Sequence, residues 1–133
     1  MINNFSNWIK LFLGTLITLC SQLFGGFDLL FKSLIFCMVA DYITGILCAL
    51  YEKKLNSKTG FKGIIKKTVI LIIVSLAVVA GKATNFEGIR NMVISFYIAN
   101  ESLSVLENAA KMDVPVISKL KKVFEQLKEN NIK

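Results

Sequence analysis

An acidic residue lies within a long apolar segment of this chain. Asp41 is surrounded by apolar residues in the run FCMVADYITGILCAL, residues 36–50. An isolated charge is costly to place in hydrocarbon, so an acid at that depth usually handles ions or protons, or binds a polar group on another helix. A second acid, Glu101, lies in the more polar segment MVISFYIANESLSVLENAA, residues 92–110. These two carboxylates are the first candidates for function.

The chain lacks the combinations of residues that catalyse reactions or hold metals and nucleotides. The chain contains no histidine, which removes the commonest general base and the commonest metal ligand. Cys20, Cys37 and Cys48 all lie in apolar runs, and we interpret them as small apolar side chains rather than as a disulfide framework. Gly60 and Gly63 lack the spacing of a phosphate-binding loop and are interpreted as a turn. We therefore predict no enzymatic activity and no cofactor.

The composition indicates an integral membrane protein. Of the 133 residues, 54% are hydrophobic and 19% are charged. A soluble fold of this size buries only about 60–70% of the surface of its unfolded chain, too little to hide so many apolar residues. We predict an all-α fold with three to four transmembrane helices and a C-terminal amphipathic helix. The candidate spans are residues 8–27, 33–51, 68–86 and 89–110, each close to the ~20 residues that cross a bilayer.

The fourth candidate span is the weakest of the four. It contains two acids and two amides, at positions 100, 101, 107 and 108. Such a segment either crosses the membrane within a bundle, where its polar groups find partners, or lies at the membrane surface.

Lysines distinguish one side of the membrane from the other. Residues 52–67 hold six lysines and one acid, and short loops rich in lysine remain in the cytoplasm. We predict a membrane domain, residues 1–110, with a basic cytoplasmic loop at 52–67, and a basic cytoplasmic tail at 111–133. This orientation explains the lysines without nucleic acid as a partner. The topology determinants are Lys53, Lys54, Lys58, Lys62, Lys66 and Lys67.

The tail is predicted to form one amphipathic helix. Pro115, the only proline, suits a first-turn position because its missing N–H has no partner there. Ile117, Leu120, Phe124 and Leu127 share one face at spacings of three and four residues. This helix either rests on anionic headgroups or packs against a partner copy.

Asp41 belongs to a stripe of small and polar residues. Steps of four residues along a helix connect Cys37, Asp41, Gly45 and Ala49, and small residues at this spacing let membrane helices approach closely. The other faces are apolar and suit lipid. The fourth segment has a similar polar face. We predict that Asp41, Gly45, Ala49, Asn100, Glu101 and Ser104 pack helices together or line a pore. Whether Lys82 or Arg90 pairs with an acid depends on depth and packing.

Four elements, in this order, resemble the toxin-secretion/phage-lysis holin family, which includes phage holins of Gram-positive hosts and the clostridial toxin-release holin. They are DYITG at 41–45, the basic segment with its Lys66–Lys67 pair, NESLSVLENA at 100–109 and PVISKL at 115–120. The resemblance begins near residue 34. Two departures are the unmatched N-terminal segment and Ile117, which stands where the family usually has a second proline.

The resemblance implies a holin. Such a protein oligomerises in the bacterial cytoplasmic membrane and forms pores or lesions that permit endolysin-dependent host lysis or the release of toxin proteins. The lipid bilayer and further copies of the chain are then its partners. The endolysin is a functional partner without necessary direct contact.

The residues alone leave two other functions open. A small ion channel or transporter subunit would place Asp41 and Glu101 along a permeation path and pass a selected solute without killing the cell. A non-conducting scaffold would use the same stripes only to join subunits, and would leak nothing. A holin differs from both by abrupt loss of viability and by the passage of large solutes.

Overall fold

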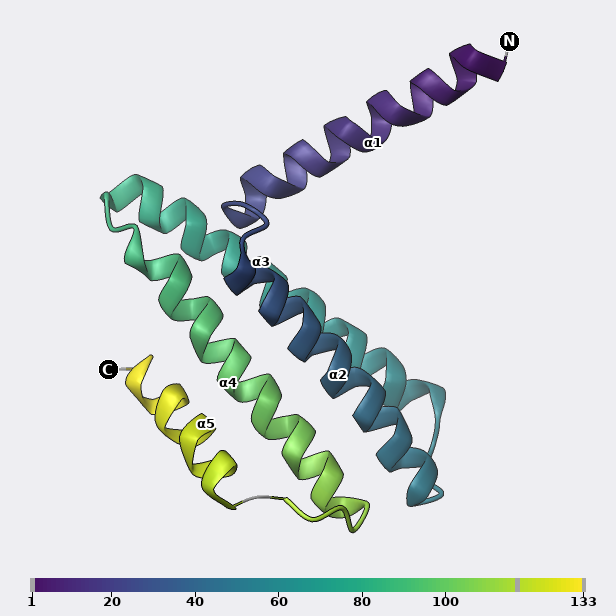
Figure 1. The fold of residues 1–133 in the computed structure, drawn as a ribbon, viewed down its shortest axis with the longest axis vertical. Helices are drawn as coiled ribbons and strands as arrows, with labels where there is room; N and C mark the ends of the chain where they lie inside the picture. Colours follow the sequence, from purple (N-terminus) through teal and green to yellow (C-terminus); the bar gives the residue numbers. More distant parts are fainter. Residues whose placement is uncertain (1, 117, 133) are drawn as a thin grey trace.

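Five helices account for most of the chain (Figure 1). The computed structural model describes residues 2–116 and 118–132, and this part of the chain contains no β-strand. The all-α prediction is therefore confirmed. The helices are α1 (Ile2–Phe24), α2 (Leu29–Tyr51), α3 (Ser57–Thr84), α4 (Gly88–Lys111) and α5 (Ser118–Asn130).

Helices α2, α3 and α4 form a bundle, in which α4 packs against both α2 and α3. From α2 to α5, successive helices run in opposite directions. The α1–α2 and α3–α4 connections therefore lie at one end, and the α2–α3 and α4–α5 connections at the other (Figure 1). Each helix contributes apolar residues at spacings of three or four, which gives it one buried stripe. The core consists of Phe31, Leu34, Met38, Ile70, Val74 and Ile94.

Helix α3 begins earlier than the sequence pattern predicted. Asn56 caps it by accepting a hydrogen bond from the backbone N–H of Thr59 at 2.8 Å, which satisfies one of the free donors of the first turn. The expected loop at 52–67 is consequently short, and the lysines at 58, 62, 66 and 67 lie on α3. The turn predicted at Gly60 and Gly63 was wrong, because both glycines are helical.

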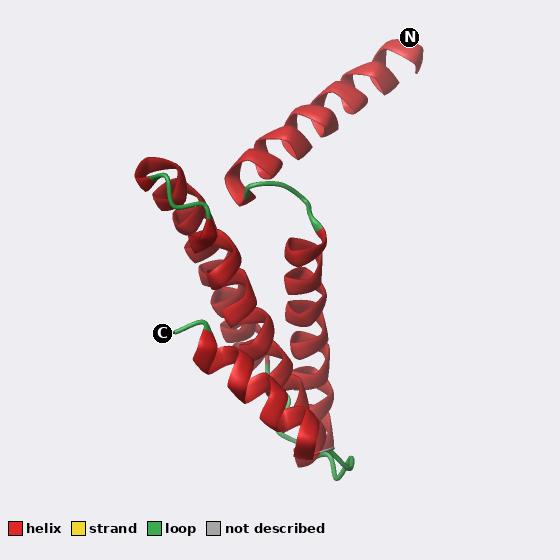
Figure 2. Cartoon of the chain, turned by 60° about the vertical axis from the view of Figure 1, so that its left-hand side comes forward, coloured by secondary structure: helices red, strands yellow, loops and turns green. Residues whose placement is uncertain are grey.

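Helix α1 projects away from the bundle (Figures 1 and 2). It starts at Ile2 and ends at Phe24, because Gly25 and Gly26 have φ angles of 71° and 110°, a region that favours glycine. The helix therefore covers most of the predicted span at 8–27 but stops before the end of that segment. It touches the bundle mainly through α3, and its apolar side chains, such as Trp8, remain exposed.

Three helices among the described residues, α1, α2 and α3, are long and apolar enough to cross a membrane. This number agrees with the prediction of three to four spans. Apolar side chains on the outer faces of α2 and α3, such as Phe36 and Leu76, are exposed, as expected for helices that contact lipid. Helix α4 is not among the three, because its polar residues lower its mean hydropathy. It packs against α2, α3 and α5.

Helix α5 folds back along α4 (Figure 2). It begins at Ser118, so Pro115 precedes the helix instead of occupying its first turn. Ile117, one of the four residues predicted to share a face, lies outside the described residues. Phe124 is half-buried, whereas Leu120 and Leu127 are exposed. The tail helix therefore packs on its own chain and leaves part of its apolar face open.

Candidate functional site

A buried cluster of charges joins the three helices of the bundle. Lys67 on α3 donates hydrogen bonds through Nζ to the carboxylates of Asp41 on α2 and Glu101 on α4. The side chains of Lys67 and Asp41 are 13% exposed, and that of Glu101 is 0% exposed. Buried ion pairs hold a structure together when close contacts and further hydrogen bonds offset the loss of hydration. We call Asp41, Lys67 and Glu101 the Lys67 cluster.

Further polar groups surround Glu101. The Nζ of Lys66 lies 3.9 Å from Oε1 of Glu101, and the Lys66 side chain is 56% exposed. Asn100 donates through Nδ2 to the same oxygen at 3.4 Å. Each carboxylate oxygen of the buried Glu101 therefore has a partner. Among the side chains of residues 4–116 and 118–132, no buried nitrogen or oxygen atom lacks a hydrogen bond, which agrees with the rule that buried polar groups are paired.

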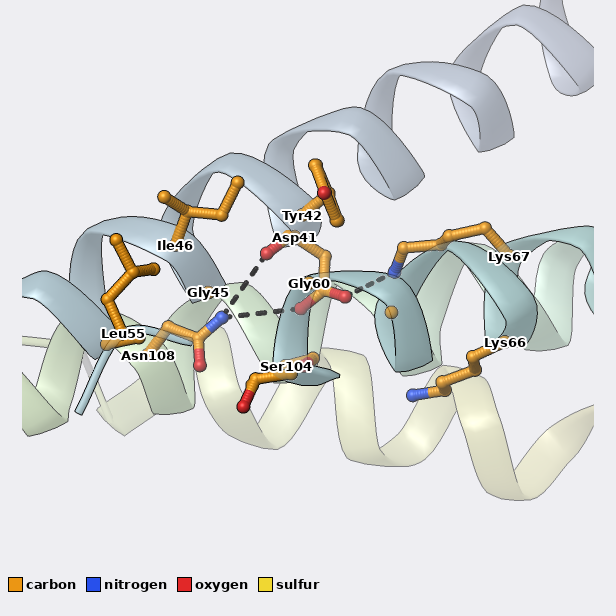
Figure 3. A pocket seen from close by; sticks show the side chains of 13 residues that line it. Asp41, Tyr42, Gly45, Ile46, Leu55, Gly60, Lys66, Lys67, Ser104 and Asn108 are labelled. Atoms are coloured by element: carbon orange, nitrogen blue, oxygen red, sulfur yellow. Dashed lines mark hydrogen bonds and ion pairs between the residues drawn. The ribbon is translucent and has the colours of Figure 1, made fainter. Parts of the chain in front are cut away.

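Asn108 extends the polar contact between α4 and α2 (Figure 3). Its Nδ2 donates to Oγ1 of Thr44 at 3.0 Å and to Oδ1 of Asp41 at 3.4 Å. Asn108 follows Glu101 by seven residues, and this spacing of two helical turns puts both side chains on the same side of α4. This contact was not predicted, although the seven-residue spacing between Glu101 and Asn108 indicates it.

Glycines allow α2 and its neighbours to approach closely beside the cluster. A Cβ atom on Gly63 would lie 3.3 Å from two ring carbons of Tyr42, so the absence of a side chain lets the ring of Tyr42 pack against α3. A Cβ atom on Gly45 would lie 3.7 Å from Nδ2 of Asn108, which is an ordinary contact. Close packing therefore depends more on Gly63 than on Gly45.

A cavity of about 210 Å³ adjoins the Lys67 cluster on the side of the α2–α3 loop (Figure 3). Because one water takes up about 30 Å³ in the liquid, the cavity has room for several waters. Its polar lining includes Asp41, Lys67, Ser104 and Asn108, and its apolar lining includes Leu55. The arrangement places a space with room for water, lined by a few polar groups among apolar ones, next to buried charges.

The predicted packing residues come together around this cavity. Asp41, Gly45, Ala49 and Ser104 line it; Glu101 binds Lys67, and Asn100 binds Glu101. Their roles in assembly stay predictions.

The predicted topology lysines separate into three groups. Lys53 and Lys54 lie in the α2–α3 connection, Lys58 and Lys62 are exposed on α3, and Lys66 and Lys67 lie at the cluster. The run of lysines predicted Lys67 as a topology determinant, and its contacts with the two acids were not predicted. The available signal was its position directly before the apolar run of α3.

A second charged site lies at the other end of the bundle. Arg90, in the first turn of α4, donates through Nε to the carbonyl oxygen of Phe24 at 2.6 Å and through its two Nη atoms to the carboxylate of Asp28 at 2.9 and 3.0 Å. We call Arg90, Phe24 and Asp28 the Arg90 clamp. Arg90 therefore pairs with the α1–α2 connection rather than with an acid inside a helix.

The clamp also organises the start of α2. Asp28 accepts a hydrogen bond from the backbone N–H of Phe31 at 3.0 Å and so caps this helix. Hydrogen bonds to Asp28 from Arg90, and then from Phe31, lower the pKa of the carboxyl group from 3.8 to about 2. Both donors favour the ionised form of the carboxyl group.

Comparisons with known proteins point to one family. A sequence model of the bacteriophage holin family matches residues 18–129. An uncharacterized 14.9 kDa protein from the nagH 3′ region of Clostridium perfringens is 36% identical over 128 residues, which cover 95% of this chain and 97% of that protein. An uncharacterized protein of Listeria monocytogenes is 46% identical over 106 residues, which cover 77% of this chain and 74% of that protein. No solved structure gives a significant match.

Proposed function

Because the chain belongs to the bacteriophage holin family, we propose that its copies assemble in the cytoplasmic membrane of a bacterial host and open lesions. An endolysin then reaches the cell wall and lyses the host, or toxin proteins leave the cell. The observation that carries this proposal is the family match over residues 18–129, which includes the whole α2–α4 bundle and nearly all of α5. The proposed activity is assembly rather than catalysis.

The distribution of polar and apolar groups supports this proposal. The outer face of α2 presents exposed apolar side chains such as Phe36 and Val39, while its inner face carries Asp41 in the Lys67 cluster. Polar side chains within membrane helices pair with one another or with water. A chain with this organisation is suited both to contact lipid and to supply polar surface when copies gather.

The arrangement of the connections supports the proposed orientation. The α2–α3 connection and the link to α5 lie at the same end of the bundle (Figure 1). The α2–α3 connection contains Lys53 and Lys54 and is followed by further lysines at the start of α3, and lysine-rich segments close to membrane helices remain in the cytoplasm. We therefore place both in the cytoplasm and the Arg90 clamp on the opposite side.

One observation favours a second candidate, a small ion channel or transporter subunit. The cavity beside the Lys67 cluster is large enough for water and is lined by charged groups, as a selective path for a small ion requires. This function would produce flux of one solute and leave the cell alive.

Expression in bacteria tests the proposal. The protein is produced alone, together with an endolysin that has no export signal, and together with the same endolysin inactivated at its catalytic site. We expect lysis only with the active endolysin, and loss of membrane potential and viability in all three cultures. Viable cells with the active endolysin would contradict the proposal, and selective ion flux in those cells would favour the channel.

A further inference from the structure

Three contacts show that α4 runs beside α2 along its whole length. Arg90 binds Asp28 at one end, and Glu101 meets Asp41 through Lys67 near the middle. At the other end, the Tyr51 hydroxyl donates to Oδ2 of Asp113 at 2.6 Å. Because α2 is long and apolar enough to cross a bilayer, α4 lies at the same membrane depth wherever α2 crosses.

Helix α5 brings charged side chains to this depth. It packs along α4, with Nζ of Lys128 lying 5.7 Å from the centre of the Phe96 ring. Phe96 precedes Glu101 by five residues, so at 1.5 Å per residue it lies about 7–8 Å beyond the Lys67 cluster. Lys121 and Glu125 lie on this stretch of α5 and are exposed. Charged groups at such a depth require water or a polar partner.

A polar strip of α4 lies between α3 and α5. On one flank of α4, Ser102 approaches Sγ of Cys37 on α2 at 3.6 Å. Asn100 and Ser104, four residues apart, lie on the opposite flank by helical geometry. Figure 3 shows Ser104 on the far side of the site from Ile46. This strip therefore points away from the lipid-facing surface of α2.

The neighbouring helices continue the polar strip on both sides. Lys62 and Lys66 are one turn apart on α3, and Lys66 reaches Glu101 of α4, so these lysines border the strip. On α5, Phe124 is half-buried against α4, while Lys121 and Glu125 occupy one flank. Because α5 runs antiparallel to α4, the right-handed winding of both helices places this flank beside the strip.

We propose that this polar face, formed by Lys62, Lys66, Asn100, Ser104, Lys121 and Glu125, borders a water-filled lumen enclosed by several copies of the chain. The outer face of α2 contacts lipid on the other side. The inference rests on the proposed function and assigns the lumen wall to α3, α4 and α5. Glu107 and Lys111 are exposed and continue the strip on α4, so the wall holds four lysines and two glutamates. It is therefore positive and attracts anions more than cations.

Movement of α5 onto the headgroups would not remove the need for water. Lys62 would remain exposed on α3, at a depth where hydrocarbon offers its charge no partner. Asn100 and Ser104 would remain half-buried beside it on α4. The polar face belongs to three helices, and a lumen satisfies all three at once.

Spin labels in vesicles of phosphatidylethanolamine and phosphatidylglycerol test this assignment. Full-length protein with alanine at positions 20, 37 and 48 receives one label, through Ser104→Cys or Glu125→Cys on the polar face or through Val39→Cys on the outer face of α2. Relative to the label at position 39, labels on the polar face should collide more with a water-soluble nickel chelate and less with oxygen. If the label at position 104 collides with oxygen and with the nickel chelate as often as the label at position 39 does, the inference is overturned. A label at 125 with headgroup depth and no proximity to α4 would overturn the place of α5 in the wall.

Dye release from the same vesicles separates this inference from the proposed function. Release of a large dye, combined with lipid-like values at position 104, overturns the wall and leaves the holin function standing. Water-like values at 104 and 125 without any dye release support the polar face and count against the holin function.

Charge reversal provides a second test that keeps the native cysteines. Lys62→Glu changes an exposed residue of the wall, and Lys54→Glu changes an exposed residue of the α2–α3 connection with the same charge difference. In ~0.01 M salt, where wall charges act over about 30 Å, we expect Lys62→Glu to lower the ratio of chloride to potassium permeability measurably, and Lys54→Glu to change it much less. Equal ratios for the two variants would overturn the assigned wall.

Discussion

The Arg90 clamp and the Lys67 cluster both join helices through one cation and carboxylate groups, but their surroundings differ. The side chain of Asp28 in the clamp is 49% exposed, whereas that of Glu101 in the cluster is 0% exposed. Water continues to solvate Asp28 when its partner is removed. Glu101 is not solvated and keeps only the more distant Lys66, at 3.9 Å, so the two sites should respond differently to the loss of one charge.

Because of this difference in burial, we expect the cluster to affect mainly the stability of the bundle and the clamp to affect mainly the direction of α1. Exposed ion pairs contribute about 0–1 kcal/mol, while removal of one member of a buried pair costs about 3–5 kcal/mol because a charge is left without a partner. The cluster therefore controls whether the bundle holds together. The clamp mainly fixes how α1 leaves the bundle, since Arg90 binds the last turn of α1 and the cap of α2.

The largest effect is expected for Lys67→Met. This change leaves Asp41 and Glu101 close together without their shared cation, and we expect the free energy of unfolding in detergent to fall by about 3–5 kcal/mol. Chemical unfolding followed by circular dichroism measures the change. Lys62→Met is the matched control on an exposed position of α3 and should change stability by less than about 0.5 kcal/mol.

A triple variant sharpens this first prediction. Asp41→Asn, Lys67→Met and Glu101→Gln together remove every charge of the cluster, so most of the lost stability should return. Equal stability of Lys67→Met and the unchanged protein would show that the cluster does not hold the bundle together. A triple variant no more stable than Lys67→Met would show that uncompensated charge is not the cause of the loss.

Removing the charge of each acid in the cluster should lower the free energy of unfolding by a different amount. Glu101→Gln removes a fully buried charge that faces both Lys67 and Lys66, and should cost about 2–3 kcal/mol. Asp41→Asn should cost about 1–2 kcal/mol, because Asp41 borders the cavity and Lys67 keeps Glu101 as a partner. The same unfolding measurement applies, and a larger loss for Asp41→Asn would contradict the order of burial.

The acids of this cluster were predictable from the sequence, whereas their pairing with Lys67 was not. Asp41 lies in an apolar run whose four-residue steps reach Gly45 and Ala49, so its inward orientation follows from helical periodicity. Lys67 belongs to a run of lysines that membrane topology already explains. Its contact with Asp41 and Glu101 depends on how far α3 is shifted along α2 and α4, and composition carries no information about that shift.

The end and direction of α1 were likewise only partly predictable from the sequence. Its apolar character predicted a span at residues 8–27, but Gly25 and Gly26 end the helix early through positive φ angles. The direction in which α1 leaves the bundle depends on Arg90, which is 62 residues after Asp28 in the sequence. Local patterns gave the helices, and long-range pairing of polar side chains determined their arrangement.

A smaller effect on stability is expected for Arg90→Lys. A lysine lacks the planar set of donors that reaches Phe24 and Asp28 together. We expect a loss of about 1 kcal/mol or less but a clearly broader distribution of distances between spin labels on α1 and α3. Pulsed electron paramagnetic resonance measures this distribution. Lys82→Ala, at an exposed position near the end of α3, is the control. Distance distributions of equal width in both variants would show that the clamp does not fix the direction of α1.

The smallest effect concerns the response of the clamp to acid. The pKa of Asp28 is about 2 in the folded chain, below its ordinary value of 3.8, so its contribution is fully present above pH 3.8 and disappears as the pH falls through 2. The distribution of α1–α3 distances should therefore stay constant from neutral pH to about pH 4 and broaden only below that range. Carbon-13 NMR of the Asp28 carboxyl group follows its titration directly. Asp28→Asn should remove this step, and a midpoint near 3.8 in the unchanged protein would show that Arg90 does not stabilise the ionised carboxylate.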